Sequence, residues 1–327
     1  MNIKRNINTK EICDQIKKGN ITALSKAITL SESNIDSDQE LANKILAKLK
    51  TKNNDSIRIG ITGVPGAGKS TFIESFGNHI TNLGLKLAVL TIDPSSSVTK
   101  GSILGDKTRM ETLSANKNVF IRPSPASNFQ GGVGKNTRES IFLCESAGYD
   151  IILIETVGVG QNEISVAEMV DFFLLLKISG SGDELQGIKR GIIEMSDLIA
   201  INKCDGDNVK DSIKAKNEFK LALQLFPKKK SNWKPQVLTC SSLTGEGLAE
   251  IWECITNYVN LTKKNNYFYE NRINQNKSWL LQIIDYSQRK SFFNRKSIKI
   301  KINNLIKKIE EQKISIFEAS RKILSEI

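Results

Sequence analysis

The sequence has 327 residues, of which 39% are hydrophobic, so it holds enough apolar material for one large or two modest folded domains and is not a disordered tail. The longest apolar run, residues 172–176, is too short to span a bilayer, and no apolar stretch follows the N-terminal residues, so we expect a cytoplasmic protein without a membrane segment. The net charge of +12 is concentrated at one end, because residues 263–327 carry 15 Lys and Arg against 6 Asp and Glu.

Residues 1–55 are predicted to be helical, because apolar side chains recur three and four positions apart between residues 12 and 49. Ser37 and Glu40 have the spacing of a capping box, which predicts that one of these helices begins there. We expect this segment to form an N-terminal helical extension.

Residues 56–262 alternate short β-branched runs with helical stretches. The runs predict seven strands, at residues 57–62, 87–92, 119–121, 151–154, 172–176, 198–201 and 237–239. This alternation is typical of an α/β fold with a mainly parallel central sheet that helices cover on both faces. Ligands in such a fold bind at the carboxyl ends of the strands, so the loops there are expected to carry the chemistry.

Residues 263–327 contain no predicted strand, and residues 274–327 have the apolar spacing of two or three amphipathic helices. Such a small C-terminal helical arm cannot bury its apolar faces by itself. We expect it to pack on the core or on a second subunit. Its positive charge leaves RNA or DNA binding as an alternative, although no known nucleic-acid module accompanies it.

A phosphate-binding loop is predicted directly after the first strand. The pattern G-x-x-x-x-G-K-[ST] runs from Gly63 to Ser70, between a strand and a helix. In such a loop the backbone N–H groups surround the phosphates, Lys69 neutralises their charge and Ser70 binds Mg²⁺. The residues predicted to bind nucleotide here are Gly63, Val64, Pro65, Gly66, Ala67, Gly68, Lys69, Ser70 and Thr71.

Three acids and one arginine are candidates for the catalytic centre. Asp93 and Glu155 each follow a predicted strand, and Asp106 lies three residues before Arg109. Phosphoryl transfer requires carboxylates that hold metal and water, with a cation for the developing phosphate charge. Asp93 could instead belong to a turn before Pro94, and Asp106 with Arg109 could form an ordinary surface ion pair.

Glu155 begins Glu155-Thr156-Val157-Gly158, where many GTPases carry D-x-x-G. An acid at that position binds Mg²⁺ through water, and the Gly158 N–H can sense the γ-phosphate. The glycine-rich hinge at residues 180–182 precedes residues 183–190, which can reorder with nucleotide state or form an amphipathic helix with a flexible entry loop. His79 lies about three helical turns beyond Lys69, too far to be the catalytic base.

A guanine-binding motif, N-K-x-D, is predicted after the sixth strand. The Asp205 carboxylate can accept the two hydrogen bonds that guanine donates and adenine does not, which excludes ATP. A helix N-cap is the alternative role for this aspartate. A serine-containing loop after the last strand would support the base from the other side. The residues predicted to bind the base are Asn202, Lys203, Asp205, Ser241, Ser242 and Leu243.

Five strings together resemble the methylmalonyl-CoA mutase-associated GTPase family, also called MeaB or ArgK-like: GVPGAGKST, IDPSSSVTKGSILGDKTRM, ETVGVGQNE, GDELQGIKRG and NKCD. The resemblance covers about residues 10–290, and strings of this length are far more specific than a bare phosphate-binding loop. The sequence departs from relatives at Lys177-Ile178-Ser179, where they tend to be more apolar with a proline, and at Asn162, where they often have serine.

The resemblance implies a P-loop GTPase that hydrolyses GTP to GDP and phosphate and escorts an adenosylcobalamin-dependent acyl-CoA mutase, gating cofactor delivery and protecting the enzyme. It also implies a homodimer held by the C-terminal helices, and a role for residues 180–190 in communicating nucleotide state to the mutase. Methylmalonyl-, ethylmalonyl- and isobutyryl-type mutases all stay open as partners. The residues that the family pattern places around phosphate, metal, water and guanine are Lys69, Ser70, Asp93, Asp106, Glu155 and Asp205.

Two other functions share parts of this pattern. A metallochaperone GTPase for nickel needs clustered imidazole or thiolate ligands, whereas this sequence has one histidine and five scattered cysteines without a CxxC pair. The same scarcity disfavours a structural zinc site and fits a reducing compartment. A kinase or ATPase linked to amino-acid transport is opposed by Asp205, because adenine lacks the matching donors.

Overall fold

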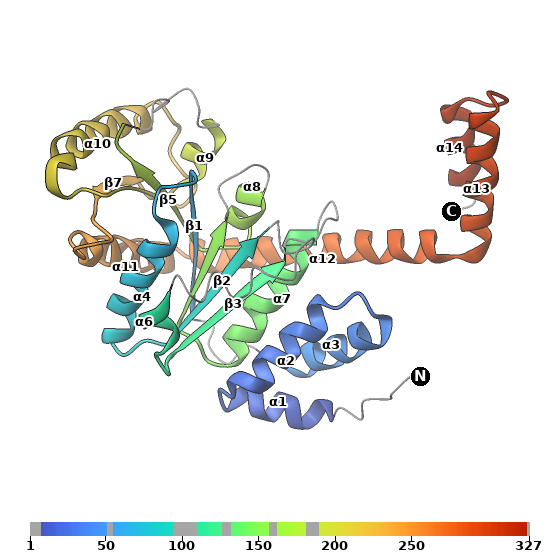
Figure 1. Cartoon of the computed structure of the whole chain (residues 1–327), viewed down its shortest axis with the longest axis horizontal. Helices are drawn as coiled ribbons and strands as arrows, with labels where there is room; N and C mark the ends of the chain where they lie inside the picture. Colours follow the sequence, from blue (N-terminus) through green and yellow to red (C-terminus); the bar gives the residue numbers. More distant parts are fainter. Residues whose placement is uncertain are drawn as a thin grey trace. The chain divides into compact units, whose positions relative to one another are not determined.

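The computed structural model describes residues 8–50, 55–93, 110–125, 132–156, 162–180 and 190–325 (Figure 1). The chain divides into two units, Met1–Gln275 and Asn276–Ile327. Among the described residues, none of the helices combines the length and the apolar character needed to cross a bilayer.

A seven-stranded parallel sheet forms the centre of the first unit, in the order β3-β2-β4-β1-β5-β6-β7. The seven predicted strands and their parallel arrangement are confirmed, and each strand extends one to four residues beyond its apolar run. The strands are β1 (Ile57–Gly63), β2 (Leu87–Asp93), β3 (Val119–Pro125), β4 (Ile151–Thr156), β5 (Phe172–Ile178), β6 (Leu198–Asn202) and β7 (Gln236–Thr239).

Helices cover both faces of this sheet, and each face has its own buried cluster. Side chains alternate between the clusters along a strand: Val89 lies with one, whereas Ala88 and Leu90 lie with the other. One face packs against α4 (Lys69–Asn82), α6 (Glu111–Ser114) and α11 (Leu248–Lys264). The other packs against α7 (Gly132–Ser146), α8 (Asn162–Ala167), α9 (Arg190–Met195) and α10 (Val209–Leu223), which follows the short 3₁₀ turn Gly206–Asn208.

The predicted N-terminal helices are confirmed as α1 (Thr9–Lys17), α2 (Ile21–Glu32) and α3 (Asp36–Lys48), whose apolar faces join the cluster around α7. The predicted capping box at Ser37 is wrong. Helix α3 begins at Asp36 with Ile35 as its N-cap, two residues before Ser37, and Ile35 makes no side-chain cap. Ser33 takes the polar role instead, because its hydroxyl accepts from the Ile35 N–H at 3.2 Å and donates to Asp38 at 2.8 Å.

The second unit is helical, as its apolar spacing predicts. It contains the end of α12 (Tyr267–Asn294), followed by α13 (Lys296–Glu310) and α14 (Ile316–Leu324). Ser315 caps α14 by accepting from the Glu318 N–H at 3.1 Å. Several large apolar side chains of this unit stay exposed, including Leu280, Leu281, Ile300, Ile316 and Phe317.

Candidate nucleotide-binding site

The phosphate-binding loop joins β1 to α4 through a backbone that only glycine fits. Gly66 and Gly68 have φ of +83° and +85°, in the left-handed region. A Cβ on Gly68 would lie 2.8 Å from Nδ2 of Asn202, and a Cβ on Gly63 would lie 2.3 Å from the Leu176 carbonyl oxygen. The predicted motif therefore forms the expected strand–loop–helix unit, with the N-terminus of α4 facing the loop.

Lys69, the first residue of α4, folds back over the loop. Its ammonium group donates to the carbonyl oxygens of Gly63 at 2.7 Å and Val64 at 3.3 Å. Burial lowers the pKa of Lys69, and the charges of Glu155 and Glu163 oppose that shift. The ammonium group thus lies in the field of two acids, next to the loop that would hold phosphates.

The structure places the predicted acid Glu155 at the same edge of the sheet. Glu155 lies on β4 in register with Ile61 of β1 and Thr91 of β2, close to the carboxyl ends of all three strands. Asp93 is the last residue of β2, and only its backbone is described. Asp106, Arg109, Gly158 and residues 181–189 lie outside the described residues.

Asn202 joins the phosphate-binding loop to the loop after β7. Its Nδ2 donates to the Ala67 carbonyl at 2.9 Å, and its Oδ1 accepts from the Ser242 N–H at 3.0 Å and the Ser242 hydroxyl at 2.8 Å. Ser75 of α4 adds a further link by donating to the Ser242 carbonyl at 2.6 Å. The two halves of the predicted nucleotide site are therefore connected directly, by a side chain that is only 1% exposed.

Asp205 lies beside the same loop, where its carboxylate accepts a hydrogen bond from the Ser241 hydroxyl. Lys203 has a left-handed backbone with φ of 59°, and its carbonyl accepts from Asn208 at 2.7 Å. The hydroxyl of Ser179 donates to the other end of the Asn208 amide at 2.7 Å. Leu243, also predicted at the base, is 83% exposed. Except for residues outside the described part, the structure brings the predicted phosphate and guanine residues to one edge of the sheet.

Comparison with known proteins agrees with this geometry. The family model for the methylmalonyl-CoA mutase-associated GTPase MeaB matches residues 24–296. This chain belongs to the MeaB family of GTPases. The GTPase ArgK of Escherichia coli is 46% identical over 266 residues, covering 81% of this chain and 80% of its own length. A mouse mitochondrial protein, the methylmalonic aciduria type A homolog, is 43% identical over 302 residues, covering 89% of this chain and 73% of its own.

A solved structure of the same architecture covers almost the whole MeaB-family chain. This structure, described as a LAO/AO transport system kinase, superposes with a TM-score of 0.75 at 34% identity and covers 98% of both chains. The family, the α/β P-loop fold and the GTPase class predicted from the sequence are thereby confirmed.

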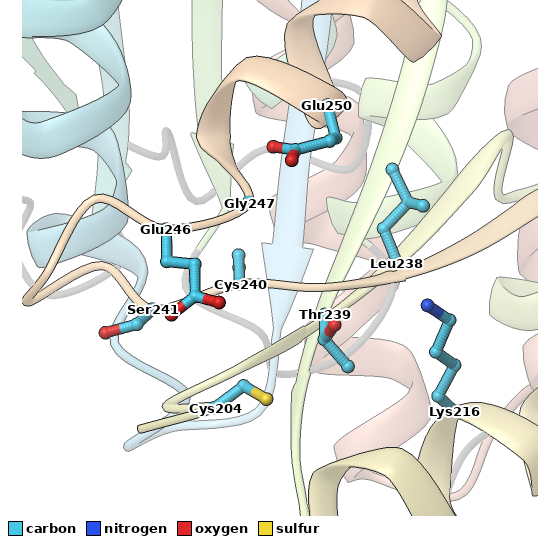
Figure 2. Close-up of a pocket in the computed structure, with 9 residues that line it drawn as sticks. All are labelled: Cys204, Lys216, Leu238, Thr239, Cys240, Ser241, Glu246, Gly247 and Glu250. Carbon is cyan, nitrogen blue, oxygen red and sulfur yellow. The ribbon is translucent and has the colours of Figure 1, made fainter. Parts of the chain in front are cut away.

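A pocket of about 190 Å³ lies beside the loops after β6 and β7 of this MeaB-family GTPase, where the base is predicted to bind. Figure 2 shows Cys204, Cys240 and Ser241 from the loops after β6 and β7, with Lys216 of α10 and Glu250 of α11 farther along its walls. Burial raises the pKa of the Cys240 thiol to about 12, so that thiol stays protonated. Within the described part of the chain, His, Cys, Asp and Glu side chains form no group of three or more that could hold a metal ion.

Three buried polar residues next to the phosphate-binding loop were not predicted from the sequence. Thr62, Thr156 and Glu163 are all buried, and Thr62 is hydrogen-bonded to both of the others. Thr62 ends an apolar strand pattern, and Thr156 occupies an unspecified position of Glu155-Thr156-Val157-Gly158, so neither stands out in the sequence. Glu163 is the last residue of the string ETVGVGQNE. Its position at the start of a helix, close to Glu155 in sequence, is the one feature that could have suggested a role in the site.

Proposed function

We propose that this MeaB-family GTPase regulates an adenosylcobalamin-dependent acyl-CoA mutase of the methylmalonyl-CoA mutase type. GTP turnover would gate loading of the cofactor and protect the mutase. The observation that carries the proposal is the match of residues 24–296 to a family described as mutase-associated. The joined phosphate and guanine loops supply the nucleotide chemistry that such regulation needs.

Nucleotide binding is proposed to use the residues of the two loops in distinct roles. Loop N–H groups from Gly63 to Gly68 and the ammonium group of Lys69 would bind the phosphates. Asp205 would accept from guanine, and the hydrogen bond from Ser241 would hold its carboxylate in place. Asn202 would keep the base and phosphate halves in register.

Mg²⁺ prefers hard oxygen donors, and the Ser70 hydroxyl and the Glu155 carboxylate would offer two of them on the phosphate side. Ser70 lies in the first turn of α4, next to Lys69, and Glu155 is close enough to act electrostatically on Lys69. We propose Ser70, Asp93, Asp106 and Glu155 as the residues that hold the ion, directly or through water. A bound Mg²⁺ would neutralise phosphate charge.

Hydrolysis is proposed to be slow in the isolated protein. His79 lies near the far end of α4, so it is not placed to be a general base. Arg109 would offset the charge that develops on the phosphate, and Asp93 and Asp106 would orient the attacking water. Partner docking would complete this arrangement and raise the rate.

Two further features belong to the proposal. The exposed apolar side chains of α12, α13 and α14 support a role for residues 263–327 as the dimerisation arm of a homodimer. The five cysteines are all free thiols, and four are buried, which supports a reducing compartment such as the cytoplasm.

The proposal is tested by measuring GTP hydrolysis with and without purified methylmalonyl-CoA mutase loaded with adenosylcobalamin. We expect weak basal turnover that rises by at least about tenfold when the mutase is added, as partner-completed GTPase sites do. A Lys69→Ala variant in the same mixture controls for contaminating GTPases and should stay inactive. Equal rates with and without methylmalonyl-, ethylmalonyl- and isobutyryl-type mutases would contradict the proposal.

A further inference from the structure

Three buried polar side chains form a connected chain at the carboxyl ends of β1 and β4. Thr62 and Thr156 are 0% exposed and Glu163 is 5% exposed. The Thr156 hydroxyl donates to the Thr62 hydroxyl at 2.8 Å, and the Thr62 hydroxyl donates to Oε1 of Glu163 at 3.2 Å. We refer to Thr62, Thr156 and Glu163 as the Thr62 clasp.

The carboxylate fixes the direction of every hydrogen bond in the Thr62 clasp. An ionised carboxylate only accepts hydrogen bonds, so the Thr62 hydroxyl must donate its single proton to the hydrogen bond with Glu163. The Thr62 oxygen is then left to accept, which orients the Thr156 hydroxyl towards it. Hydrogen bonds to a charged group are roughly twice as strong as neutral ones, so Glu163 anchors the chain.

The Thr62 clasp connects two parts of the nucleotide site. Thr62 directly precedes Gly63, whose carbonyl accepts from the Lys69 ammonium group at 2.7 Å. Thr156 follows Glu155 on β4, and Glu163 lies in the first turn of α8. The chain of hydroxyls therefore ties the last residue of β4 and the start of α8 to the strand that enters the phosphate-binding loop.

Glu163 also acts on the phosphate-binding lysine through its charge. Glu155 and Glu163 are the two acids whose charges favour the protonated form of Lys69 against the effect of burial. Glu155 has a proposed role at the metal, whereas neither the motif nor the proposed mechanism gives Glu163 one. Its burial and its place at the end of the hydroxyl chain suit a group that holds others in position.

We propose that Glu163 is a positioning residue for GTP hydrolysis, which through Thr62 and Thr156 aligns β4 and α8 with the phosphate-binding loop. Its negative charge acts on Lys69, next to the loop proposed to hold the phosphates, so it opposes tight binding of GTP while it favours the aligned arrangement. Neutralising it is expected to separate the two effects: the protein should bind nucleotide at least as well and hydrolyse it more slowly.

The test compares Glu163→Gln with the wild-type full-length protein. Glutamine keeps the size of the side chain and an acceptor for Thr62 but removes the charge. We expect kcat for GTP to fall by about tenfold, the amount that one weakened charge-assisted hydrogen bond explains, while the Kd for GDP and for a nonhydrolysable GTP analogue stays equal or decreases. Single-turnover kinetics and calorimetric titration measure the two quantities.

Two threonine variants show whether Glu163 acts through the hydroxyl chain. Thr62→Val removes the hydroxyl and keeps the shape, and we expect a similar fall in kcat. The double variant Thr62→Val with Glu163→Gln should be little slower than either single variant, because both break the same chain. Thr62→Ser returns the hydroxyl and should recover most of the rate lost in Thr62→Val.

Several results would overturn the role of Glu163. Wild-type kcat in Glu163→Gln would do so, and so would additive losses in the double variant. A parallel loss of GDP affinity, GTP affinity and thermal stability would indicate a structural role only. If Thr62→Val does not fold, Thr156→Val, which leaves the Thr62–Glu163 hydrogen bond intact, must reduce kcat without weakening GDP binding for the proposal to stand.

Discussion

Polar groups are arranged differently at the amino and carboxyl ends of the strands. At the amino ends, buried charges are paired within the protein: Arg58 makes two hydrogen bonds to Glu145, at 2.8 and 2.9 Å, and Arg272 of α12 makes two to Asp171, at 2.8 and 2.6 Å. Ser56 adds a hydrogen bond to Glu145 at 2.8 Å. Burial alone would lower the pKa of Arg272, but Asp171 and Glu145 raise it.

At the carboxyl ends, the polar groups lie around the predicted phosphate-binding loop. Among the residues that the structure describes, Lys69 donates to carbonyl oxygens of that loop, and Asp205 accepts from Ser241 while its carboxylate can accept further hydrogen bonds. The difference indicates that the two ends of one sheet have different roles. Paired charges at the amino ends contribute to the stability of the fold, and the groups at the carboxyl ends are the ones that we propose bind GTP.

The largest expected effect comes from breaking a pair at the amino ends. Arg272→Met removes the bidentate partner of Asp171 and leaves a carboxylate buried, so we expect the free energy of unfolding to fall by about 3–5 kcal/mol. Nucleotide affinity should hardly change. Urea denaturation and calorimetric titration with GDP measure both. Lys214→Met, which removes an exposed ion pair with Glu218, is the matched control and should cost less than about 1 kcal/mol.

The next effect tests the carboxyl ends. Asp205→Asn replaces an acceptor of two hydrogen bonds with an amide that also donates, so GTP affinity should fall by about a hundredfold while xanthine nucleotides gain affinity. Stability should stay near that of the wild type. Asp207→Asn, two residues along and exposed, is the control and should bind GTP normally. Unchanged GTP affinity in Asp205→Asn would contradict the guanine assignment.

A smaller effect concerns Glu139 of α7. This buried acid forms an ion pair with Lys135 at 3.7 Å, which is longer than the bidentate contacts at the amino ends. Burial raises the pKa of Glu139 to about 7, although Lys135 opposes the shift. The folded protein then holds this proton more tightly than the unfolded chain, so stability is lost as pH rises from about 4.5 to 7.

Glu139→Gln should therefore stabilise the protein by about 1–3 kcal/mol more at pH 8 than at pH 5. Denaturation curves at the two pH values measure this difference. An equal effect of the substitution at both would show that Glu139 titrates normally.

The comparison also explains what the sequence could predict. Short β-branched runs and glycine-dependent turns are local signals, so the seven strands and the strand–loop–helix unit around residues 63–70 are predicted correctly. The roles of Asn202, Lys203 and Asp205 at guanine stay predictions. Ion pairs between residues that are far apart in the sequence produce no comparable local pattern. Nothing near Arg58 in the sequence indicates Glu145, and nothing near Lys229 indicates Asp197, with which it pairs at 2.7 Å.

The Thr62 clasp escaped prediction for the same reason. Thr62 and Thr156 have the spacing of ordinary strand residues, and only the parallel pairing of β1 with β4 brings them together. The capping box at Ser37 fails because Ser33, outside the helix pattern, offers a competing set of hydrogen bonds at the start of α3.

The most direct test of the account is calorimetric titration of the full-length protein, with Mg²⁺ present, against nonhydrolysable analogues of GTP and ATP. We predict saturable binding of the GTP analogue and at least about a hundredfold weaker binding of the ATP analogue, because adenine cannot donate two hydrogen bonds to Asp205. Equal affinity for the two analogues, or no heat with the GTP analogue, would contradict the guanine-nucleotide site at the carboxyl ends of the sheet.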